Sequence, residues 1–204
     1  MGRTGAGKSS FVKLLWRGMK PYRGTVLIDG QDISKLDAKS FRREMMIITQ
    51  KPCLFEGSIS ENIDPHKIER EDLSLMLGML RDLGFDENKL DPDLNFQLEN
   101  EGSNLSQGEQ QILSLVRAVY LKRKLMILDE ATAYLDSKTE KKFQKILDAQ
   151  FRQTTMIIVT HKIQTVKFCD KIAVFDQGRI VEFDSPENLL ANPNSLFSAI
   201  SRTM

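Results

Sequence analysis

Apolar residues in this chain fall into short continuous runs that alternate with segments of helical spacing. Continuous runs bounded by polar residues are typical of strands covered on both faces of a sheet. Such runs occupy residues 45–49, 125–128 and 156–159, and residues 24–30 predict a further strand. Residues 9–19 predict a helix. Because strands and helical segments alternate, we expect an α/β fold with a mostly parallel sheet.

Between residues 51 and 120 the apolar positions change to helical spacing, as at Leu73, Leu77 and Leu80. This change predicts a helical insert within the α/β core. The expected organisation is therefore a core made of residues 1–50 and 121–204 and a helical subdomain made of residues 51–120.

The last part of the chain carries two local signals. Residues 172–183 alternate between apolar and polar around Gln177 and Gly178, which predicts a β-hairpin. Ser185 followed by Pro186 predicts the beginning of a helix, with a capping hydroxyl and a proline in the first turn.

Composition and charge disfavour nucleic acid and a membrane surface as direct partners. The 204 residues include 29 Lys and Arg against 28 Asp and Glu, so the net charge is +1. This balance gives no electrostatic footprint for nucleic acid or for a membrane surface. No apolar stretch approaches the length of a membrane-spanning helix. Cys53 and Cys169 lie far apart without metal-ligand spacing, so we expect ordinary reduced thiols.

A complete phosphate-binding loop, G-x-x-x-x-G-K-S, occupies residues 2–9. Its backbone N–H groups and the following helix N-terminus suit phosphate oxygens. Lys8 is expected to bridge the β- and γ-phosphates, and the Ser9 hydroxyl to join a Mg²⁺ shell. A solvated surface lysine is the plain alternative. The residues expected at the nucleotide are Gly2, Arg3, Thr4, Gly5, Ala6, Gly7, Lys8, Ser9 and Ser10.

A second element, LMILDEAT at residues 125–132, is an apolar run that ends in paired carboxylates. Asp129 stands at the carboxyl end of the predicted strand, where open α/β sheets bind ligands, and is expected to hold Mg²⁺. Glu130 is a candidate general base for water that attacks the γ-phosphate. Helix capping is the alternative for two acids at a strand end, and the phosphate loop disfavours it.

Two further features are ambiguous from the residues alone. Ser106 precedes Glu109 by three positions and an apolar helix follows, which is the pattern of a capping box. The same helix N-terminus, with Ser106 and Gly108, could equally hold a phosphate from another molecule. His161 follows a predicted strand, where a histidine is more often a hydrogen-bonded loop residue than a catalyst.

In order along the chain, GRTGAGKSS, the glutamine of IITQKPCLFEGSISENIDP, NLSQGE, LMILDEATAYLD, VTHK and DQGRIVEFDSP resemble the nucleotide-binding domain of ATP-binding cassette (ABC) transporters. The resemblance runs essentially from end to end. Within that superfamily the chain is similar to subfamily C, the multidrug-resistance-associated exporters. It is most similar to their second, C-terminal nucleotide-binding domain. The resemblance implies a P-loop NTPase fold with a RecA-like core.

The resemblance also implies ATP hydrolysis by two such domains paired head to tail. Each ATP would lie between the phosphate loop of one domain and the signature segment of the other, here residues 105–109. Gln50 would sense Mg²⁺ or the attacking water, and His161 would contact the γ-phosphate and hold Glu130 and water in place. The implied catalytic residues are Glu130, His161 and Gln50, the Mg²⁺ ligands are Ser9, Gln50 and Asp129, and the contacts to the partner's ATP are Ser106, Gln107, Gly108, Glu109 and Asp136.

The chain departs from the family pattern at the signature and at its beginning. Gln107 and Glu109 stand where the family usually has glycine and glutamine, and a carboxylate there favours a degenerate partner site unless it is turned away. Glu130 is intact, which favours a competent site at this chain's own loop. The antiparallel strands that precede the phosphate loop in the family, and the strand that feeds it, are expected to be missing.

Three functions therefore remain open. The first is an ATP-hydrolysing domain of an exporter, with ATP and Mg²⁺ as cofactors, at the cytoplasmic face of a membrane. Its partners would be a second nucleotide-binding domain and transmembrane domains, with no nucleic acid. The second is a non-transport ABC protein acting on nucleic acid or ribosomes, which predicts a basic surface or a second cassette in tandem, and the sequence shows neither. The third is an inactive fragment that serves as an interaction module.

Overall fold

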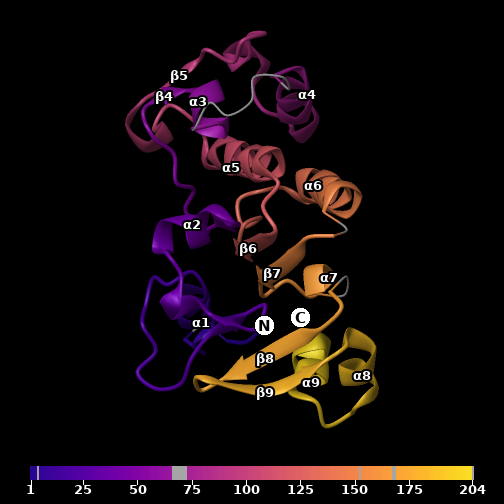
Figure 1. Cartoon of the computed structure of the whole chain (residues 1–204). Coiled ribbons are helices and arrows are strands. Elements are labelled where there is room, and N and C mark those ends of the chain that lie inside the picture. Colours follow the sequence, from indigo (N-terminus) through magenta and orange to yellow (C-terminus); the bar gives the residue numbers. More distant parts are fainter. Residues whose placement is uncertain (4, 66–72, 152, 167–168, 204) are drawn as a thin grey trace. The chain divides into compact units, whose positions relative to one another are not determined.

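The computed structural model describes residues 1–3, 5–65, 73–151, 153–166 and 169–203 (Figure 1). The chain divides into two compact units, unit 1 with Met1–Arg43 and Ile157–Met204 and unit 2 with Glu44–Met156. Thr4, one of the residues predicted at the nucleotide, lies outside the described residues.

Unit 1 begins with the predicted phosphate loop, followed by helix α1 (Lys8–Leu15). The helix is shorter than the predicted span of residues 9–19. It ends because Arg17 adopts a left-handed backbone with φ 60°, and the N–H groups of Gly18 and Met19 both turn back to the Lys13 carbonyl. The helical spacing of apolar residues continues past this point in the sequence, but the helical backbone conformation ends here.

The predicted strand at residues 24–30 is wrong in its extent. Strand β1 (Leu27–Ile28) pairs antiparallel with β2 (Gln31–Asp32), a hairpin that the apolar pattern did not predict. Asp29 and Gly30 form the turn with φ 49° and 74°, as a two-residue Asp-Gly hairpin loop requires. The 3₁₀-helix η1 (Ile33–Lys35) and helix α2 (Ala38–Arg43) complete this part of the unit.

The predicted hairpin near the end is confirmed. Strands β8 (Ile172–Asp176) and β9 (Arg179–Asp184) are antiparallel around a turn in which Gln177 and Gly178 have positive φ. Helix α8 (Pro186–Ala191) begins where predicted, because the Ser185 hydroxyl accepts from the Asn188 N–H at 3.3 Å. This part of unit 1 also contains two short helices, α7 (Ile163–Val166) before β8 and α9 (Leu196–Thr203) after α8. Their buried core includes Val166, Ile172, Val174, Leu189 and Phe197.

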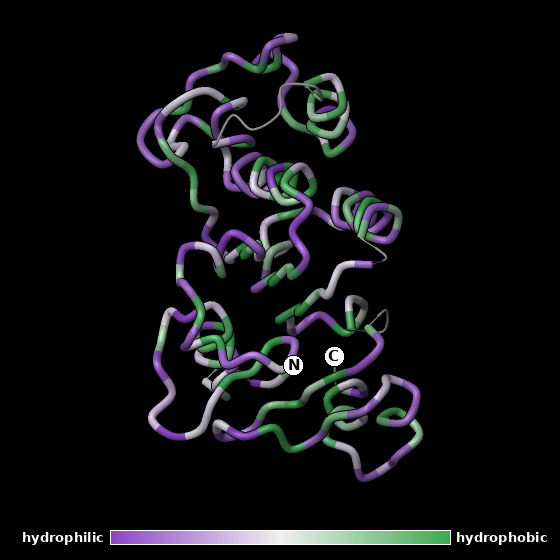
Figure 2. The backbone as a smooth tube through the Cα atoms, viewed as in Figure 1, coloured by the Kyte–Doolittle hydropathy of each residue, from purple (hydrophilic) through white to green (hydrophobic). Residues whose placement is uncertain are grey.

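Unit 2 contains the parallel sheet that the apolar runs predicted. Strand β3 (Met45–Ile48) pairs parallel with β6 (Leu125–Asp129), and Ile48 lies opposite Leu128. Strand β7 (Thr155–Val159), which begins in this unit, is third in the order β3-β6-β7. Met126 and Ile127 are fully buried, as expected for a central strand. In Figure 2, green, apolar stretches mark the strands of this sheet, whereas the helices carry both colours.

The helices of unit 2 pack around α5 (Gln107–Leu121). It contacts α3 (Ile59–Ile63), α4 (Leu73–Leu83) and β3, while α6 (Ser137–Gln150) packs on α4 (Figure 1). Short elements between them are β4 (Gly57–Ser58), β5 (Gln97–Leu98), η2 (Glu87–Lys89) and η3 (Asn100–Gly102). Because unit 2 joins these helices to β3 and β6, a separate subdomain at residues 51–120 stays a prediction.

Candidate functional site

The phosphate loop starts from a segment held against β8. The amino group of Met1 donates to the Ala173 carbonyl at 2.7 Å, and the Phe175 N–H donates to the Met1 carbonyl at 2.8 Å. Gly2 continues this contact as a parallel bridge to Phe175. At Gly2 φ is +147°, and a Cβ would lie 2.3 Å from the Phe175 carbonyl oxygen, so only glycine fits this close approach.

The loop then closes on itself and delivers the chain into α1. The Ala6 N–H donates to the Arg3 carbonyl, and the Gly178 N–H donates to the Ala6 carbonyl, each at 3.1 Å. Gly7 is the N-cap of α1, with φ 100° and no side chain to accept from the first turn. The first N–H groups of a helix have no acceptor within the helix, so this N-terminus fits an anion such as a phosphate oxygen.

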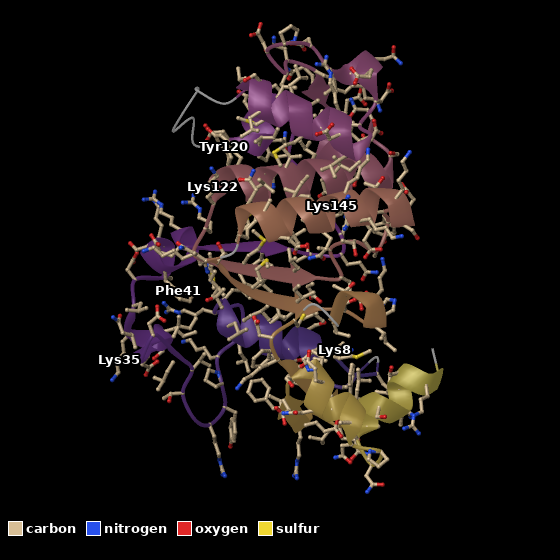
Figure 3. All side chains as sticks on the ribbon, turned by 90° about the vertical axis from the view of Figure 1, so that its right-hand side faces the viewer. Lys8, Lys35, Phe41, Tyr120, Lys122 and Lys145 are labelled. Carbon is tan, nitrogen blue, oxygen red and sulfur yellow. The ribbon has the colours of Figure 1, made fainter. Side chains whose placement is uncertain are left out.

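Lys8 is held inside the loop. Its ammonium donates to the carbonyls of Gly2 at 2.7 Å and of Arg3 at 2.9 Å, and its side chain is half-buried (Figure 3). These two bonds argue against the alternative of a solvated surface lysine. Ser9 and Ser10, by contrast, are exposed in the first turn of α1. The loop therefore presents one fixed positive charge and two hydroxyls at a helix N-terminus.

A second group of predicted residues meets at one end of the unit 2 sheet. Asp129 is the last residue of β6 and Gln50 follows β3 by two positions. Because Ile48 and Leu128 are opposite each other in parallel strands, Gln50, Asp129 and Glu130 leave the sheet at the same edge. Glu130 has φ 52°, a left-handed conformation that side-chain-bearing residues rarely adopt and that is concentrated at functional sites.

The helix-capping alternative for the paired acids is not supported, because another residue caps the next helix. The Asp136 carboxylate accepts from the N–H groups of Lys138 at 2.8 Å and Thr139 at 3.0 Å, at the beginning of α6. A bond from the Thr139 hydroxyl, then these backbone bonds, hold the pKa of Asp136 below its usual value. Asp136 itself is exposed.

The predicted capping box at the signature segment is confirmed. The Ser106 hydroxyl accepts from the Glu109 N–H at 3.2 Å, and the Glu109 carboxylate accepts from the Ser106 N–H at 2.8 Å. Ser106 and Gln107 are exposed, Gly108 is half-buried and Glu109 is buried. The helix N-terminus is therefore accessible at Ser106, while the carboxylate is turned back toward the protein.

Lys89 binds this carboxylate, which the sequence did not predict. Its ammonium donates to both carboxylate oxygens of Glu109, at 2.8 and 3.0 Å. Burial alone would raise the pKa of Glu109, but the hydrogen bonds from Lys89 and from Ser106 outweigh it and hold that pKa below its usual value. Glu109 therefore remains a carboxylate at neutral pH, and the Lys89 ammonium balances its negative charge.

Two polar residues inside α5 also escaped the sequence interpretation. The side-chain oxygen of Gln111 accepts from the Tyr134 N–H at 2.9 Å, which fixes the loop after β6 against α5. The Gln111 amide nitrogen and the Ser114 hydroxyl are buried without a hydrogen-bond partner among the described residues. The available signal for these buried polar groups was a glutamine and a serine on the apolar face of a predicted helix.

Arg117, farther along α5, connects the helix to the segment that follows Gln50. Its guanidinium donates to the Cys53 carbonyl at 2.7 Å, to the Asn62 side-chain oxygen at 3.1 Å and to the Asn62 carbonyl. It also lies 5.9 Å from the centre of the Phe55 ring. Desolvation lowers the pKa of Arg117 from its usual value. A single arginine in an apolar helix was the only signal for this network.

His161 belongs to unit 1, together with the phosphate loop. It is exposed and follows β7, where the Lys162 N–H donates to the Thr160 hydroxyl at 2.9 Å. The predicted residues are thus distributed over both units. Unit 1 carries the loop and His161, and unit 2 carries Gln50, Asp129, Glu130, the signature segment and Asp136.

Three further features of the described residues concern the requirements of a metal cluster, a disulfide and a membrane span. Among the described residues, no group of three or more His, Cys, Asp or Glu is placed to hold a metal. Mg²⁺ needs no such group, because one or two oxygen ligands and substrate phosphates suffice. Both cysteines are free thiols, as predicted. No helix in the described part of the chain is long and apolar enough to cross a bilayer.

The comparisons with known proteins show the family to which the chain belongs. The family model described as ABC transporter matches residues 1–133. The chain is 40% identical over 200 residues to ATP-binding cassette sub-family C member 2 of Rattus norvegicus, covering 97% of this chain and 13% of that protein. It is 38% identical over 218 residues to Bile pigment transporter 1 of Saccharomyces cerevisiae, covering 98% of this chain and 14% of that protein.

A solved structure shares the fold. A bacterial Atm1-family ABC exporter with ATP bound superposes with a TM-score of 0.88 at 29% identity, over 99% of this chain and 36% of that chain. The P-loop NTPase type of α/β fold predicted from the sequence is confirmed by this likeness. The chain spans 13 to 14% of the length of the two transporters named above.

Proposed function

Because this chain belongs to the ABC transporter family and is an ATP-binding, ATP-hydrolysing domain of the exporter type, we propose that it drives an exporter as one of two paired domains. In this proposal it acts at the cytoplasmic face of a membrane, and the region 51–120 relays the state of the nucleotide to transmembrane domains. The observation that carries the proposal is the Lys8 ammonium held inside an uncapped helix N-terminus.

ATP binding rests on the phosphate loop. Lys8 would exchange its carbonyl partners for β- and γ-phosphate oxygens, and the first N–H groups of α1 would donate to the same phosphates. Ser9 would contribute its hydroxyl to Mg²⁺. The remaining contacts would come from Gly2, Arg3, Thr4, Gly5, Ala6, Gly7 and Ser10 along the loop.

Hydrolysis rests on the residues at the edge of the unit 2 sheet and on His161. Asp129 and Gln50 would hold Mg²⁺ together with Ser9, and bound Mg²⁺ would neutralise charge that develops on the phosphates. Glu130 would accept a proton from water as the water oxygen bonds to the γ-phosphorus and the bond to the β-phosphate oxygen breaks, which leaves ADP and phosphate. His161 would orient the γ-phosphate and the water.

Pairing rests on the signature segment. Ser106 is exposed at the N-terminus of the 15-residue helix α5, and Gly108 brings its backbone there without a side chain. Ser106, Gln107 and Gly108 would contact the nucleotide bound to the partner domain. Glu109 would shape this surface from beneath, and the exposed Asp136 would meet the partner beside it.

Titration of ATP with Mg²⁺ into three forms of the chain tests the assignment of the loop. Lys8→Ala should lose at least about tenfold in ATP affinity, because it removes the charge that holds the phosphates. Glu130→Gln should bind ATP like the parent. Equal affinity in Lys8→Ala and the parent would contradict the proposed nucleotide site.

Ser106→Arg tests the assignment of the signature. The variant should bind ATP as a monomer with parent affinity but lose ATP-driven pairing, because the arginine occupies the surface offered to the partner's nucleotide. If monomer binding is lost instead, the capping box is the main role of Ser106 and the helix itself has been disrupted.

A further inference from the structure

Glu109 poses an electrostatic problem at the signature segment. It lies three residues after Ser106 in the first turn of α5, where the resemblance places a second domain's triphosphate. A negative charge in this turn stabilises the helix itself, because it complements the positive end of the helix dipole. The same charge would repel a phosphate that approaches the helix end.

The contacts of Glu109 resolve this problem within the protein. Its side chain is 11% exposed, and that of Lys89 is 20% exposed. The Lys89 ammonium contacts both carboxylate oxygens, at 2.8 and 3.0 Å, while the Ser106 N–H donates to one of them at 2.8 Å. Among the described residues, Lys89 is also within 4.0 Å of Asp86, whose side chain is more exposed than that of Glu109.

We propose that Lys89 is a positioning residue that keeps the signature segment competent to receive a nucleotide bound to a second domain. By contacting both oxygens, it cancels the charge of Glu109 and holds the carboxylate away from the exposed Ser106 hydroxyl. The inference rests on the proposed function, in which two domains pair through ATP. It replaces the expectation of a degenerate partner site, since that expectation required an uncompensated carboxylate.

The position of Lys89 suits this role. It is the last residue of η2, twenty positions before Glu109, and η2 follows the helix α4 that packs on α5. The ammonium therefore comes from a neighbouring element and reaches the carboxylate without adding a charged side chain to the exposed N-terminus of α5. A neutral pair replaces the neutral glutamine that the family usually has.

Two single variants and their combination test the proposal, all in a Glu130→Gln background that prevents turnover. Sedimentation velocity with ATP and Mg²⁺ gives the dissociation constant of the paired chain. Lys89→Met leaves the carboxylate uncompensated and should weaken pairing about tenfold or more. Glu109→Gln keeps the capping box and leaves the Lys89 charge near the phosphates, so it should tighten pairing several-fold. The double variant should return to the parent value.

This pattern of signs separates a role in charge compensation from a structural one. If the ion pair only stabilises α5, both single variants should weaken pairing and the double variant should not recover it. Lys124→Met is the matched control, because it removes a lysine from an exposed ion pair with Glu44. Lys124 follows the opposite end of α5, about 22 Å away along the helix, an end that the labels Tyr120 and Lys122 mark in Figure 3. It should pair like the parent.

The outcome for Ser106→Arg separates failure of this inference from failure of the proposed function. If Ser106→Arg abolishes pairing but Lys89→Met pairs like the parent, or if both Lys89→Met and Glu109→Gln weaken it, the role of Lys89 is refuted alone. If the parent does not pair with ATP, or Ser106→Arg pairs normally, the proposed function and the inference fall together.

Discussion

Arg117 offers the most quantitative test of how α5 is built into unit 2. Replacement by methionine keeps much of the apolar stem and removes the guanidinium that donates to Cys53 and Asn62. Asn62 would lose a partner at both its carbonyl and its side-chain oxygen. The same side chain also brackets the Phe55 backbone, accepting from its N–H at 3.1 Å and donating to its carbonyl at 2.9 Å.

The expected cost follows from these contacts. Hydrogen bonds from a charged donor contribute about 1.5 to 3 kcal/mol each, and a buried acceptor left without a donor costs about 1 to 3 kcal/mol. The desolvation that lowers the pKa of Arg117 offsets part of this, because methionine need not be stripped of water. We therefore expect Arg117→Met to lower the free energy of unfolding by about 2 to 4 kcal/mol.

Urea unfolding followed by far-ultraviolet circular dichroism measures this change. Arg81→Met is the matched control, because Arg81 makes an exposed ion pair with Glu87 at 3.1 Å. Removal of such a pair should cost less than about 1 kcal/mol. The reasoning is refuted if Arg117→Met lies within about 1 kcal/mol of the parent, or if Arg81→Met costs as much as Arg117→Met.

Two further predictions concern the loop and the signature. Gly2→Ala should lower the thermal midpoint by several degrees in differential scanning calorimetry, because its Cβ would lie 2.3 Å from the Phe175 carbonyl oxygen; an unchanged midpoint would contradict the close approach. Glu109 has a folded-state pKa below its usual value of 4.5, so its contribution to stability is complete above that pH and is lost as pH falls through the folded pKa. Acid titration should therefore destabilise the parent more than Glu109→Gln below pH 4.5, and parallel curves would contradict this assignment.

Local patterns predicted those parts of the structure that depend on neighbouring residues. The apolar runs gave β3, β6 and β7, and the capping box at Ser106 and the hairpin turn at Gln177 formed as expected. The predicted helix at residues 9–19 was too long. The real helix ends because Arg17 adopts a left-handed backbone, and the spacing of apolar residues does not indicate this change. The sequence Asp29-Gly30 is a turn signal that the sequence interpretation missed, so it did not predict the hairpin there.

The contacts that complete the candidate site could not be predicted in this way. Lys89 and Glu109 are 20 positions apart, and Arg117 is 55 positions from Asn62. Such pairs depend on how α4, η2 and α3 pack against α5, and an isolated lysine or arginine in the sequence is most often a solvated surface charge. The expectation of a degenerate partner site depended on an uncompensated charge at Glu109, and the contact with Lys89 that balances this charge was not visible in the sequence.

Steady-state phosphate release is the most direct test of the claim that this chain hydrolyses ATP with Glu130 as the base. The assay compares the parent and Glu130→Gln with ATP and Mg²⁺ at a chain concentration where sedimentation shows pairing. Glutamine preserves the size of the side chain and removes the proton acceptor, so the rate should fall by about 10² to 10⁴ while ATP affinity is retained. Release at the parent rate by Glu130→Gln would contradict the claim.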